Sequence, residues 1–464
     1  MATENSHWGQ ARLSALMACV RRLFFIGIGG IHMTTLALMA HWRGLSVSGS
    51  DRAESENVAR LRRAGIPVFI GHDAAHVAGA EAVIYTLAVD ADNPEYAAAA
   101  AAGLPLVSRA EYLGYLMSPY PNRIGVAGSH GKSTVTAWLT DIFHLAHRSP
   151  TAVCGAVMRR YRAAFTLGTG RDFIFEACEY KRSFLAFRPT LAVLLNAAYD
   201  HVDAYRDPAS LCDAFARFLS LPGESGRVLV GADDPSALEA AETACNAVTF
   251  GLSKTADYHP LDLTFDRGMG RFLVATPAGV LGRATLIVPG VHNVKNALAA
   301  AAAAHLCGVD ASAILGGLSC FGGAARRMEY RGEWRGVRLY DDYAHHPDEI
   351  AAALSTARLL LGGAGRLFAV FQSHTYSRTA AFFDPITGAL RLSDRVFVAD
   401  IYPARETETL GMSGALLADS VGEKAAYVGD IPAIAEALKS ELRPGDLLLV
   451  MGAGDIDRIF AEFA

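Results

Sequence analysis

A glycine-rich segment that follows a short apolar run carries residue types that bind polyphosphates. Residues 123–134 read R-I-G-V-A-G-S-H-G-K-S-T. Glycines let the backbone turn so that N–H groups and a helix N-terminus face one anion. Lys132 would add a positive charge on the terminal phosphates, and Ser133 would add a hydroxyl ligand for magnesium. Because Val126 stands where the strict motif has glycine, a plain strand-to-helix turn with a chance lysine remains the alternative.

Two candidate metal ligands follow later strands of the same predicted sheet. Residues 173–176 read as a β-run that ends in Glu176, and residues 191–196 form the next apolar run before His201. Since the ends of parallel strands meet at one edge, Glu176 and His201 are expected to reach a metal held by Ser133. A solvated carboxylate and a helix-capping Asp-His pair are the structural alternatives.

An earlier turn is typical of a nucleotide-binding α/β unit. The apolar run 23–26 precedes Gly27, Gly29 and Gly30, and a second apolar run delivers Ser50 and Asp51. The turn predicts a diphosphate site, with the acid near a ribose hydroxyl. His32 replaces the third glycine of the dinucleotide motif, so a nucleotide-sugar diphosphate fits as well as a dinucleotide.

Further ligand contacts are expected at the same sheet edge. Thr86 and Ala88 follow the apolar run 82–85, and Arg109 follows the run 105–107. A ligand at the carboxyl ends of these strands would meet these residues. A solvated helix cap is the alternative for Arg109.

A long alanine-rich helix is predicted to start near His292. Asn293 and Asn296 are three residues apart and share a helix face, where their amides could hold a nucleotide ring or phosphate. Capping of the helix by Asn293 is the alternative. Beyond this helix, Arg326 and Arg327 mark a predicted hinge.

The last third of the chain alternates apolar strands with helical stretches, which predicts another parallel α/β sheet. Polar clusters follow three of these strands, at residues 341–347, 372–378 and 452–455. Three clusters on one sheet edge favour a site that faces another domain over three unrelated surface loops.

Composition limits the remaining possibilities. The chain has 464 residues, 52% of them hydrophobic, and a net charge of −5. At roughly 100 to 200 residues per domain, it is expected to form three α/β domains, at residues 1–120, 121–324 and 325–464. The charge gives no reason to expect nucleic acid or an anionic membrane as a partner. The seven cysteines form no C-x-x-C pair, so reduced thiols are expected rather than disulfides or a zinc site.

No segment predicts a membrane protein. The longest weakly polar runs are short and alanine-rich, well below the roughly 20 apolar residues of a membrane span. Residues 1–20 do not resemble a secretory signal, because Glu4 and His7 stand at the front and Arg21 and Arg22 follow. A cytoplasmic protein is expected.

Taken together, the motifs resemble the Mur ligases of peptidoglycan synthesis, from Phe24 to Ile456. The phosphate loop is similar to that family's G-[ST]-H-G-K-[ST], which accounts for Val126. The segment 341–347, D-D-Y-A-H-H-P, is similar to the D-D-Y-[GA]-H-H-P of family members that act on UDP-N-acetylmuramate itself, with an amino acid or a ready-made peptide. The resemblance implies two Rossmann-like domains at the ends and a central ATP-binding domain with a mostly parallel sheet.

The resemblance also implies ATP-driven joining of L-alanine to the lactyl carboxylate of UDP-N-acetylmuramate through an acyl phosphate, with Mg²⁺ or Mn²⁺, in a monomer or homodimer. Catalytic roles fall on Lys132, Glu176, His201 and Arg327, and metal ligation on Ser133, Glu176 and His201. The implied ATP contacts are Gly128, Ser129, His130, Gly131, Lys132, Ser133, Thr134, His292, Asn293, Asn296, Arg327 and Asp342. The implied substrate contacts are Gly27, Gly29, Gly30, Met33, Ser50, Asp51, Thr86, Ala88, Arg109, His346, His374 and Arg378.

Four residues depart from the family pattern. Ala198 replaces a common Glu, Lys181 and Arg182 stand where an acid is usual, and Thr375 takes a place often held by Arg. These departures bear on the acceptor site more than on the phosphate chemistry. They leave open a recycling ligase that attaches a peptide, or a nucleotide-binding regulator that has lost the reaction.

Overall fold

A computed structural model describes residues 8–87, 89–244, 246–363, 365–404 and 406–463. Their contacts group the chain into two compact units. The first unit comprises Met1–Ala197 and Cys212–Val248, and the second comprises Ala198–Leu211 and Thr249–Ala464. Each unit is described by itself below.

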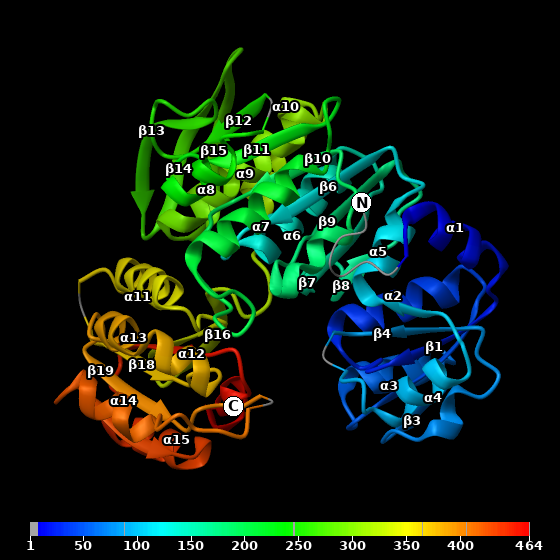
Figure 1. Cartoon of the computed structure of the whole chain (residues 1–464). Helices are drawn as coiled ribbons and strands as arrows, with labels where there is room; N and C mark the ends of the chain where they lie inside the picture. Colours follow the sequence, from blue (N-terminus) through cyan, green and yellow to red (C-terminus); the bar gives the residue numbers. More distant parts are fainter. Residues whose placement is uncertain (1–7, 88, 245, 364, 405, 464) are drawn as a thin grey trace. The chain divides into compact units, whose positions relative to one another are not determined.

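The first sheet of the first unit has five parallel strands in the order β3-β2-β1-β4-β5, drawn in blue in Figure 1. This order is that of a Rossmann-type sheet without its sixth strand, and ligands of such sheets bind at the carboxyl ends of the strands. The strands are β1 (Arg22–Ile26), β2 (Ser46–Asp51), β3 (Val68–Ile70), β4 (Ala82–Tyr85) and β5 (Leu106–Ser108). The accompanying helices are α1 (Gln10–Cys19), α2 (Ile31–Trp42), α3 (Glu56–Arg63), η1 (Ala74–Val77), α4 (Pro94–Ala101) and α5 (Arg109–Met117).

A seven-stranded sheet follows, in the order β12-β11-β10-β6-β9-β7-β8. Strands β10, β6, β9 and β7 run parallel, and β8 is antiparallel to β7. The strands are β6 (Asn122–Ala127), β7 (Thr151–Met158), β8 (Ala163–Thr166), β9 (Asp172–Glu176), β10 (Leu191–Leu194), β11 (Arg227–Gly231) and β12 (Ala247–Phe250). The helices are α6 (Lys132–Leu145), η2 (Tyr180–Ala186), α7 (Pro208–Ser220) and α8 (Pro235–Ala240).

The second unit contains an antiparallel sheet that was not predicted from the sequence. Its three strands follow one another in the chain and pair as antiparallel neighbours. They are β13 (His259–Asp266), β14 (Met269–Thr276) and β15 (Gly279–Pro289). They lead into α9 (Val291–Leu306), the predicted alanine-rich helix, and α10 (Ala311–Cys320). Eight consecutive residues of α9, 297–304, are buried, so alanine there allows close packing from every side.

The six-stranded sheet of the second unit has the order β16-β17-β21-β18-β19-β20. The strands are β16 (Glu329–Trp334), β17 (Val337–Asp342), β18 (Leu367–Phe371), β19 (Arg395–Ala399), β20 (Ala425–Gly429) and β21 (Leu447–Met451). Five run parallel, which confirms the α/β prediction, and β16 is antiparallel to β17. The helices are α11 (Pro347–Leu361), α12 (Tyr376–Ala381), α13 (Phe383–Leu390), α14 (Gly414–Val421), α15 (Ile431–Glu441) and η3 (Ile456–Phe463).

Two apolar cores cover the two faces of this sheet. Leu367, Ala369 and Phe371 pack with α11, α13 and α14, whereas Phe368 and Val370 pack with α15 and η3. The alternation follows the two-residue period of a strand whose faces are both buried. Such a rigid sheet can position polar residues at its strand ends.

Among the residues that the structure describes, none of the helices combines the length and apolar character needed to span a bilayer.

Candidate functional site

The glycine-rich loop joins β6 to α6 in the first unit. Gly128 and Gly131 have φ of 136° and 85°, backbone conformations that residues with a Cβ rarely adopt. Gly131 is the N-cap of α6, and no described side chain caps that helix. A helix N-terminus without a side-chain cap, preceded by a glycine turn, favours an anion.

Asn196, directly after β10, holds this loop in place. Its Oδ1 accepts a hydrogen bond from the His130 N–H at 2.9 Å, and its Nδ2 donates to the His130 carbonyl at 3.0 Å. A Cβ on Gly128 would lie 3.1 Å from both the backbone N and the backbone O of Asn196. Sequence reasoning gave Asn196 no role, although an amide at the end of a strand beside β6 was a usable signal.

Lys132, the first residue of α6, is folded back over the loop. Its Nζ donates to the carbonyls of Gly128 at 2.5 Å and Ser129 at 3.1 Å, and lies 2.9 Å from both carboxylate oxygens of Glu179. Burial alone would lower the pKa of Lys132, but Glu179, Cys178 and Glu176 outweigh it and raise this pKa. Lys132 is therefore a partly buried cation at a helix N-terminus, as a polyphosphate site requires.

Ser133 and Glu176 lie side by side beneath the loop. The Ser133 hydroxyl donates to Glu176 Oε2 at 2.7 Å, and the Gly155 N–H donates to the same oxygen at 2.7 Å. A Cβ on Gly155 would lie 2.5 Å from Glu176, so the glycine makes room for the carboxylate. A hydroxyl and a carboxylate oxygen are donors that Mg²⁺ prefers, and this pair fits the implied metal. Ser129 and Thr134 are also buried in the loop region.

The first glycine turn connects β1 to α2. The N–H groups of Gly27 and Ile28 each donate to the Ser50 carbonyl at 2.9 Å, and the Gly29 N–H donates to Asp51 Oδ2 at 2.8 Å. Gly30 is the N-cap of α2, without a side-chain cap from the described residues. The predicted residues therefore lie together, with one oxygen of Asp51 engaged by the turn itself.

The Ser50 side chain belongs to a cluster that the sequence did not reveal. Glu95, fully buried in the first turn of α4, accepts from Ser50 Oγ at 2.6 Å. Its two oxygens also lie 2.7 Å from Nδ1 of His72 and Nδ1 of His76. Glu95 thus fixes side chains at the carboxyl ends of β2 and β3, the edge at which a ligand is expected.

The other predicted residues of this edge have different surroundings. Thr86 follows β4, close to Gly27, and Met33 is buried in α2. Arg109 begins α5, is not exposed, and has Nη2 3.4 Å from Ser183 Oγ. The alternative of a solvated helix cap is wrong for Arg109, because Ser108 caps α5. Ala88 lies outside the described residues.

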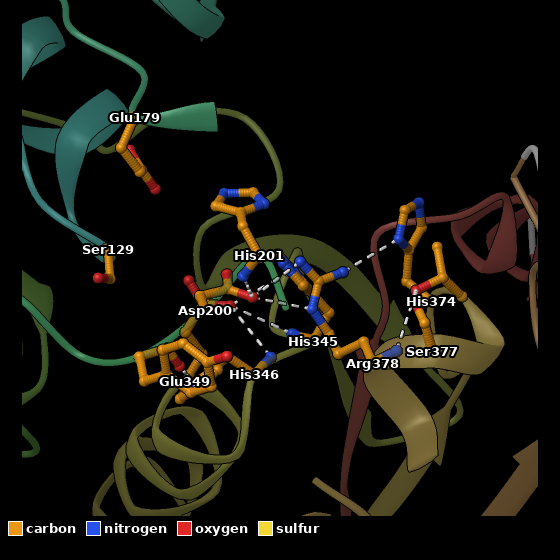
Figure 2. A network of polar contacts seen from close by, with 12 residues as sticks. Ser129, Glu179, Asp200, His201, His345, His346, Glu349, His374, Ser377 and Arg378 are labelled. Carbon is orange, nitrogen blue, oxygen red and sulfur yellow. Dashed lines mark hydrogen bonds and ion pairs between the residues drawn. The ribbon is translucent and has the colours of Figure 1, made fainter. Parts of the chain in front are cut away.

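In the second unit, Asp200 and Arg378 form a buried ion pair between residues 178 positions apart. Arg378 donates to Asp200 Oδ1 from Nε at 3.1 Å and Nη2 at 2.9 Å. Burial would raise the pKa of Asp200, but His201 and Arg378 outweigh it and hold this pKa below its ordinary value. Figure 2 shows Arg378 between Asp200 and His374, whose Nδ1 lies 3.3 Å from Nη1 of Arg378. Asp200 was not among the predicted site residues.

Histidines surround this pair, and burial keeps two of them neutral. Burial, with Arg378 nearby, lowers the pKa of His374 to about 4. Burial likewise lowers the pKa of His345 to about 4, and its Nδ1 donates to the Tyr343 carbonyl at 2.9 Å. His346 caps α11, with Nδ1 accepting from the Asp348 N–H at 3.3 Å and Nε2 donating to the Tyr199 carbonyl at 3.1 Å. His201 belongs to the same unit, with its N–H 2.7 Å from Asp200 Oδ1.

Asp342, at the end of β17, contacts the segment of the predicted hinge. Its carboxylate accepts from the N–H groups of Met328 at 2.7 Å and Ala344 at 2.8 Å. Burial raises its pKa to about 6, although Arg327 opposes this rise. The Arg327 guanidinium lies 3.7 Å from Glu349 and 5.1 Å from the centre of the Tyr343 ring. The predicted hinge therefore carries a guanidinium next to the predicted strand-end cluster.

The start of α9 corrects one alternative. Gly290, with φ of 102°, is the N-cap, so capping by Asn293 is wrong. Asn293 Nδ2 donates to the Pro289 carbonyl at 2.7 Å, and Asn296 Nδ2 donates to Asn293 Oδ1 at 3.2 Å, so the two amides share a face as predicted. Burial and Arg327 lower the pKa of His292 to about 4.

The residues that depart from the family pattern lie in particular local structures. Lys181 and Arg182 have φ of 49° and 54° within η2, and the exposed Lys181 points its ammonium to the Leu87 carbonyl at 3.4 Å. Thr375 caps α12. Ala198 is the first residue of the second unit.

Three family models match the chain in succession. They are "Mur ligase family, catalytic domain" at residues 22–121, "Mur ligase middle domain" at 126–304 and "Mur ligase, glutamate ligase domain" at 326–454.

Curated relatives and solved structures match over nearly the whole length. UDP-N-acetylmuramate–L-alanine ligase of Acetivibrio thermocellus is 39% identical over 96% of this chain and 95% of its own, and that of Caldicellulosiruptor bescii is 38% identical over 95% and 97%. The structure of UDP-N-acetylmuramate-alanine ligase MurC from Thermotoga maritima has a TM-score of 0.81 at 29% identity, covering 95% of this chain and 98% of that one. A murein peptide ligase from Psychrobacter arcticus has the same fold, with a TM-score of 0.72 at 23% identity over 96% and 98%.

Proposed function

The chain belongs to the Mur ligase family, and on this premise we propose that it joins L-alanine to the lactyl carboxylate of UDP-N-acetylmuramate with hydrolysis of ATP to ADP and phosphate. Full-length relatives named for this reaction support the substrates. The observation that carries the proposal is the glycine loop with Lys132 and Ser133, each held by a buried carboxylate.

The first step would transfer a phosphoryl group. A lactyl carboxylate oxygen attacks the γ-phosphorus of ATP, the bond to the β–γ bridging oxygen breaks, and ADP leaves. Two anions must approach each other, so the site must offset negative charge. Lys132 and the N-terminus of α6 would hold the phosphates, and Arg327 would add a guanidinium. A divalent cation on Ser133, Glu176 and His201 would neutralise further charge when bound.

The second step would form the amide. The amine of L-alanine attacks the carbonyl carbon of the acyl phosphate, phosphate leaves with the C–O bond electrons, and the amine loses a proton. We assign Arg378 to the amino-acid carboxylate, because Asp200 and His374 fix its guanidinium. His346 would support this site by its fixed capping geometry. Exclusion of water would protect the acyl phosphate from hydrolysis.

The sugar nucleotide would bind at the first glycine turn. Gly27, Gly29 and Gly30 present a turn to a diphosphate at the start of α2, with Met33 packed in that helix. Ser50, Asp51, Thr86, Ala88 and Arg109 are assigned to the rest of this ligand. On the ATP side, His292, Asn293, Asn296 and Asp342 are assigned to the nucleotide. We place the domain boundaries at 1–120, 121–324 and 325–464, and the enzyme in the cytoplasm.

A phosphate-release assay tests this function. With ATP, Mg²⁺ and UDP-N-acetylmuramate, we expect phosphate release only when L-alanine is added, and a product heavier by one alanine residue. Release with a tripeptide but not with L-alanine would identify the recycling ligase instead. Nucleotide binding without release under any of these conditions would identify a regulator that has lost the reaction.

A further inference from the structure

Lys132 has a counter-ion of its own inside the protein. Glu179 is 1% exposed and both of its carboxylate oxygens lie 2.9 Å from Lys132 Nζ. Two loop carbonyls, of Gly128 and Ser129, accept from the same Nζ. The ammonium that should meet a phosphate is thus fully engaged by the protein.

We propose that Glu179 is a positioning residue that holds Lys132 in the nucleotide-free loop, an inference that rests on the proposed ATP site. A polyphosphate that binds the loop must then draw Lys132 away from Glu179. Glu179 would thereby weaken the binding of both ATP and ADP and favour release of ADP after each turnover.

Glu179 is held firmly enough to act in this way. Glu179 lies three residues after the end of β9. The chain then turns at Lys181 and Arg182, whose backbones are in the left-handed conformation. The Arg182 N–H donates to the Glu179 carbonyl at 2.7 Å, and Ser183 Oγ donates to the Cys178 carbonyl at 3.0 Å. These bonds hold the backbone that carries the Glu179 carboxylate.

Loss of this pair has an electrostatic cost. Moving Lys132 away gives up its ion pair with the buried Glu179 carboxylate, and a polyphosphate on the loop would place further negative charge beside that carboxylate. Glu176 plays a different part, because it contacts Ser133 and the Gly155 N–H rather than Lys132. The two carboxylates thus contact different functional residues of the loop, Glu179 contacting Lys132 and Glu176 contacting Ser133.

Calorimetric titration of ATP and ADP without divalent metal tests the proposal. Glu179→Gln removes the charge and keeps the shape, so we expect the Kd for both nucleotides to fall by roughly tenfold, which is about 1.4 kcal/mol. Glu179→Asp keeps the charge and should remain close to wild type. Binding of adenosine, which has no phosphates, should be equal in wild type and Glu179→Gln.

Asp172→Asn is the matched control. Asp172 is a buried carboxylate at the other end of β9 that accepts from Arg148 Nε at 2.8 Å and Nη2 at 2.6 Å. Its removal should leave nucleotide Kd values unchanged. Equal or weaker binding of ATP by Glu179→Gln would overturn the proposal.

A structure of the wild-type chain with ADP gives a second test that needs no variant. We expect Lys132 Nζ on a phosphate oxygen and no longer on Glu179. Persistence of the Lys132–Glu179 contact beside bound phosphates would overturn the inference while leaving the proposed function intact. Failure of the wild type to bind either nucleotide would overturn the proposed function, and the inference with it.

Discussion

The glycine loop of the first unit and the cluster of the second unit that contains Asp200, Arg378, His345 and His374 differ in the charge of their titratable groups. In the loop, neighbouring carboxylates raise the pKa of Lys132 and keep it charged. In the cluster, burial lowers the pKa values of His345 and His374 to about 4 and keeps both rings neutral at pH 7. The loop is therefore built to bind an anion by charge, whereas the cluster surrounds one ion pair, Asp200–Arg378, with neutral rings.

The difference predicts which perturbations each region tolerates. Anion binding by the loop should depend on its positive charge and should be insensitive to moderate acid. The cluster should depend on an intact ion pair and lose stability in acid.

Lys132→Ala should abolish turnover while leaving the Kd for UDP-N-acetylmuramate nearly unchanged. Loss of a preorganised charge on a transferring phosphoryl group costs about 3 kcal/mol or more of transition-state stabilisation. Phosphate release and sugar-nucleotide titration measure the two effects. Lys181→Ala is the control, because this exposed lysine contacts the Leu87 carbonyl and should be dispensable. Wild-type turnover in Lys132→Ala would remove the loop from the mechanism.

Asp200→Asn should destabilise the second unit, because it leaves the buried Arg378 guanidinium without its counter-ion. Breaking a buried pair from one side costs about 3 to 5 kcal/mol. Urea unfolding measures the change. The double variant with Arg378→Met should recover part of the loss, since both charges are then gone. A single variant as stable as wild type would show that the pair is not important for the cluster.

Glu176→Ala should raise the magnesium concentration for half-maximal rate by roughly 10 to 100-fold, the usual effect of losing a group that holds or orients a metal ligand. His201→Ala should act in the same direction if it is a ligand. The rate measured against magnesium concentration decides this. An unchanged magnesium dependence in both variants would return these residues to structural roles.

Acid should weaken the cluster through its histidines. The pKa of His374 is about 4 when folded against 6.5 ordinarily, so between these values the unfolded chain binds more protons. The free energy of unfolding therefore falls as pH drops through this window, by at most about 1.4 kcal/mol per pH unit for each such histidine.

Asp341 and Asp342 act in the opposite sense. Burial raises their pKa values to about 7 and about 6 respectively. Between the ordinary and the raised pKa values the folded chain binds more protons than the unfolded chain, so the free energy of unfolding falls as pH rises through that window. Comparing wild type with His374→Gln by urea unfolding between about pH 7 and about pH 5 isolates the histidine. We expect the variant to lose less stability than wild type on acidification. Parallel pH profiles would contradict the assignment.

The sequence predicts much of the framework because parallel strands bring their ends to one edge. The alternation of apolar runs and helices located the strands that precede Gly27, Gly128 and the 341–347 cluster. Glu176 and Ser133 were expected together and lie 2.7 Å apart. Local spacing was sufficient there, because Glu176 ends β9, Ser133 comes after β6, and these two strands are parallel neighbours.

Other features depend on contacts that local patterns do not encode. Asp200 and Arg378 pair across 178 positions, so neither stretch alone reveals the ion pair. The pairing of Glu179 with Lys132 depends on a left-handed turn at two non-glycine residues. The antiparallel strands β13–β15 were not predicted, although residues 261–266 of β13 alternate apolar and polar types. Only one residue of β13 is buried, so this strand offers little core surface from which its place in a sheet could be predicted.

In the proposed reaction, the lactyl carboxylate attacks the γ-phosphate of ATP. UDP-N-acetylmuramate labelled with ¹⁸O in that carboxylate, incubated with ATP, Mg²⁺ and L-alanine, tests this claim directly. We expect one labelled oxygen in the released phosphate, measured by mass spectrometry, for each amide formed from a doubly labelled carboxylate. Amide formation with unlabelled phosphate would contradict it.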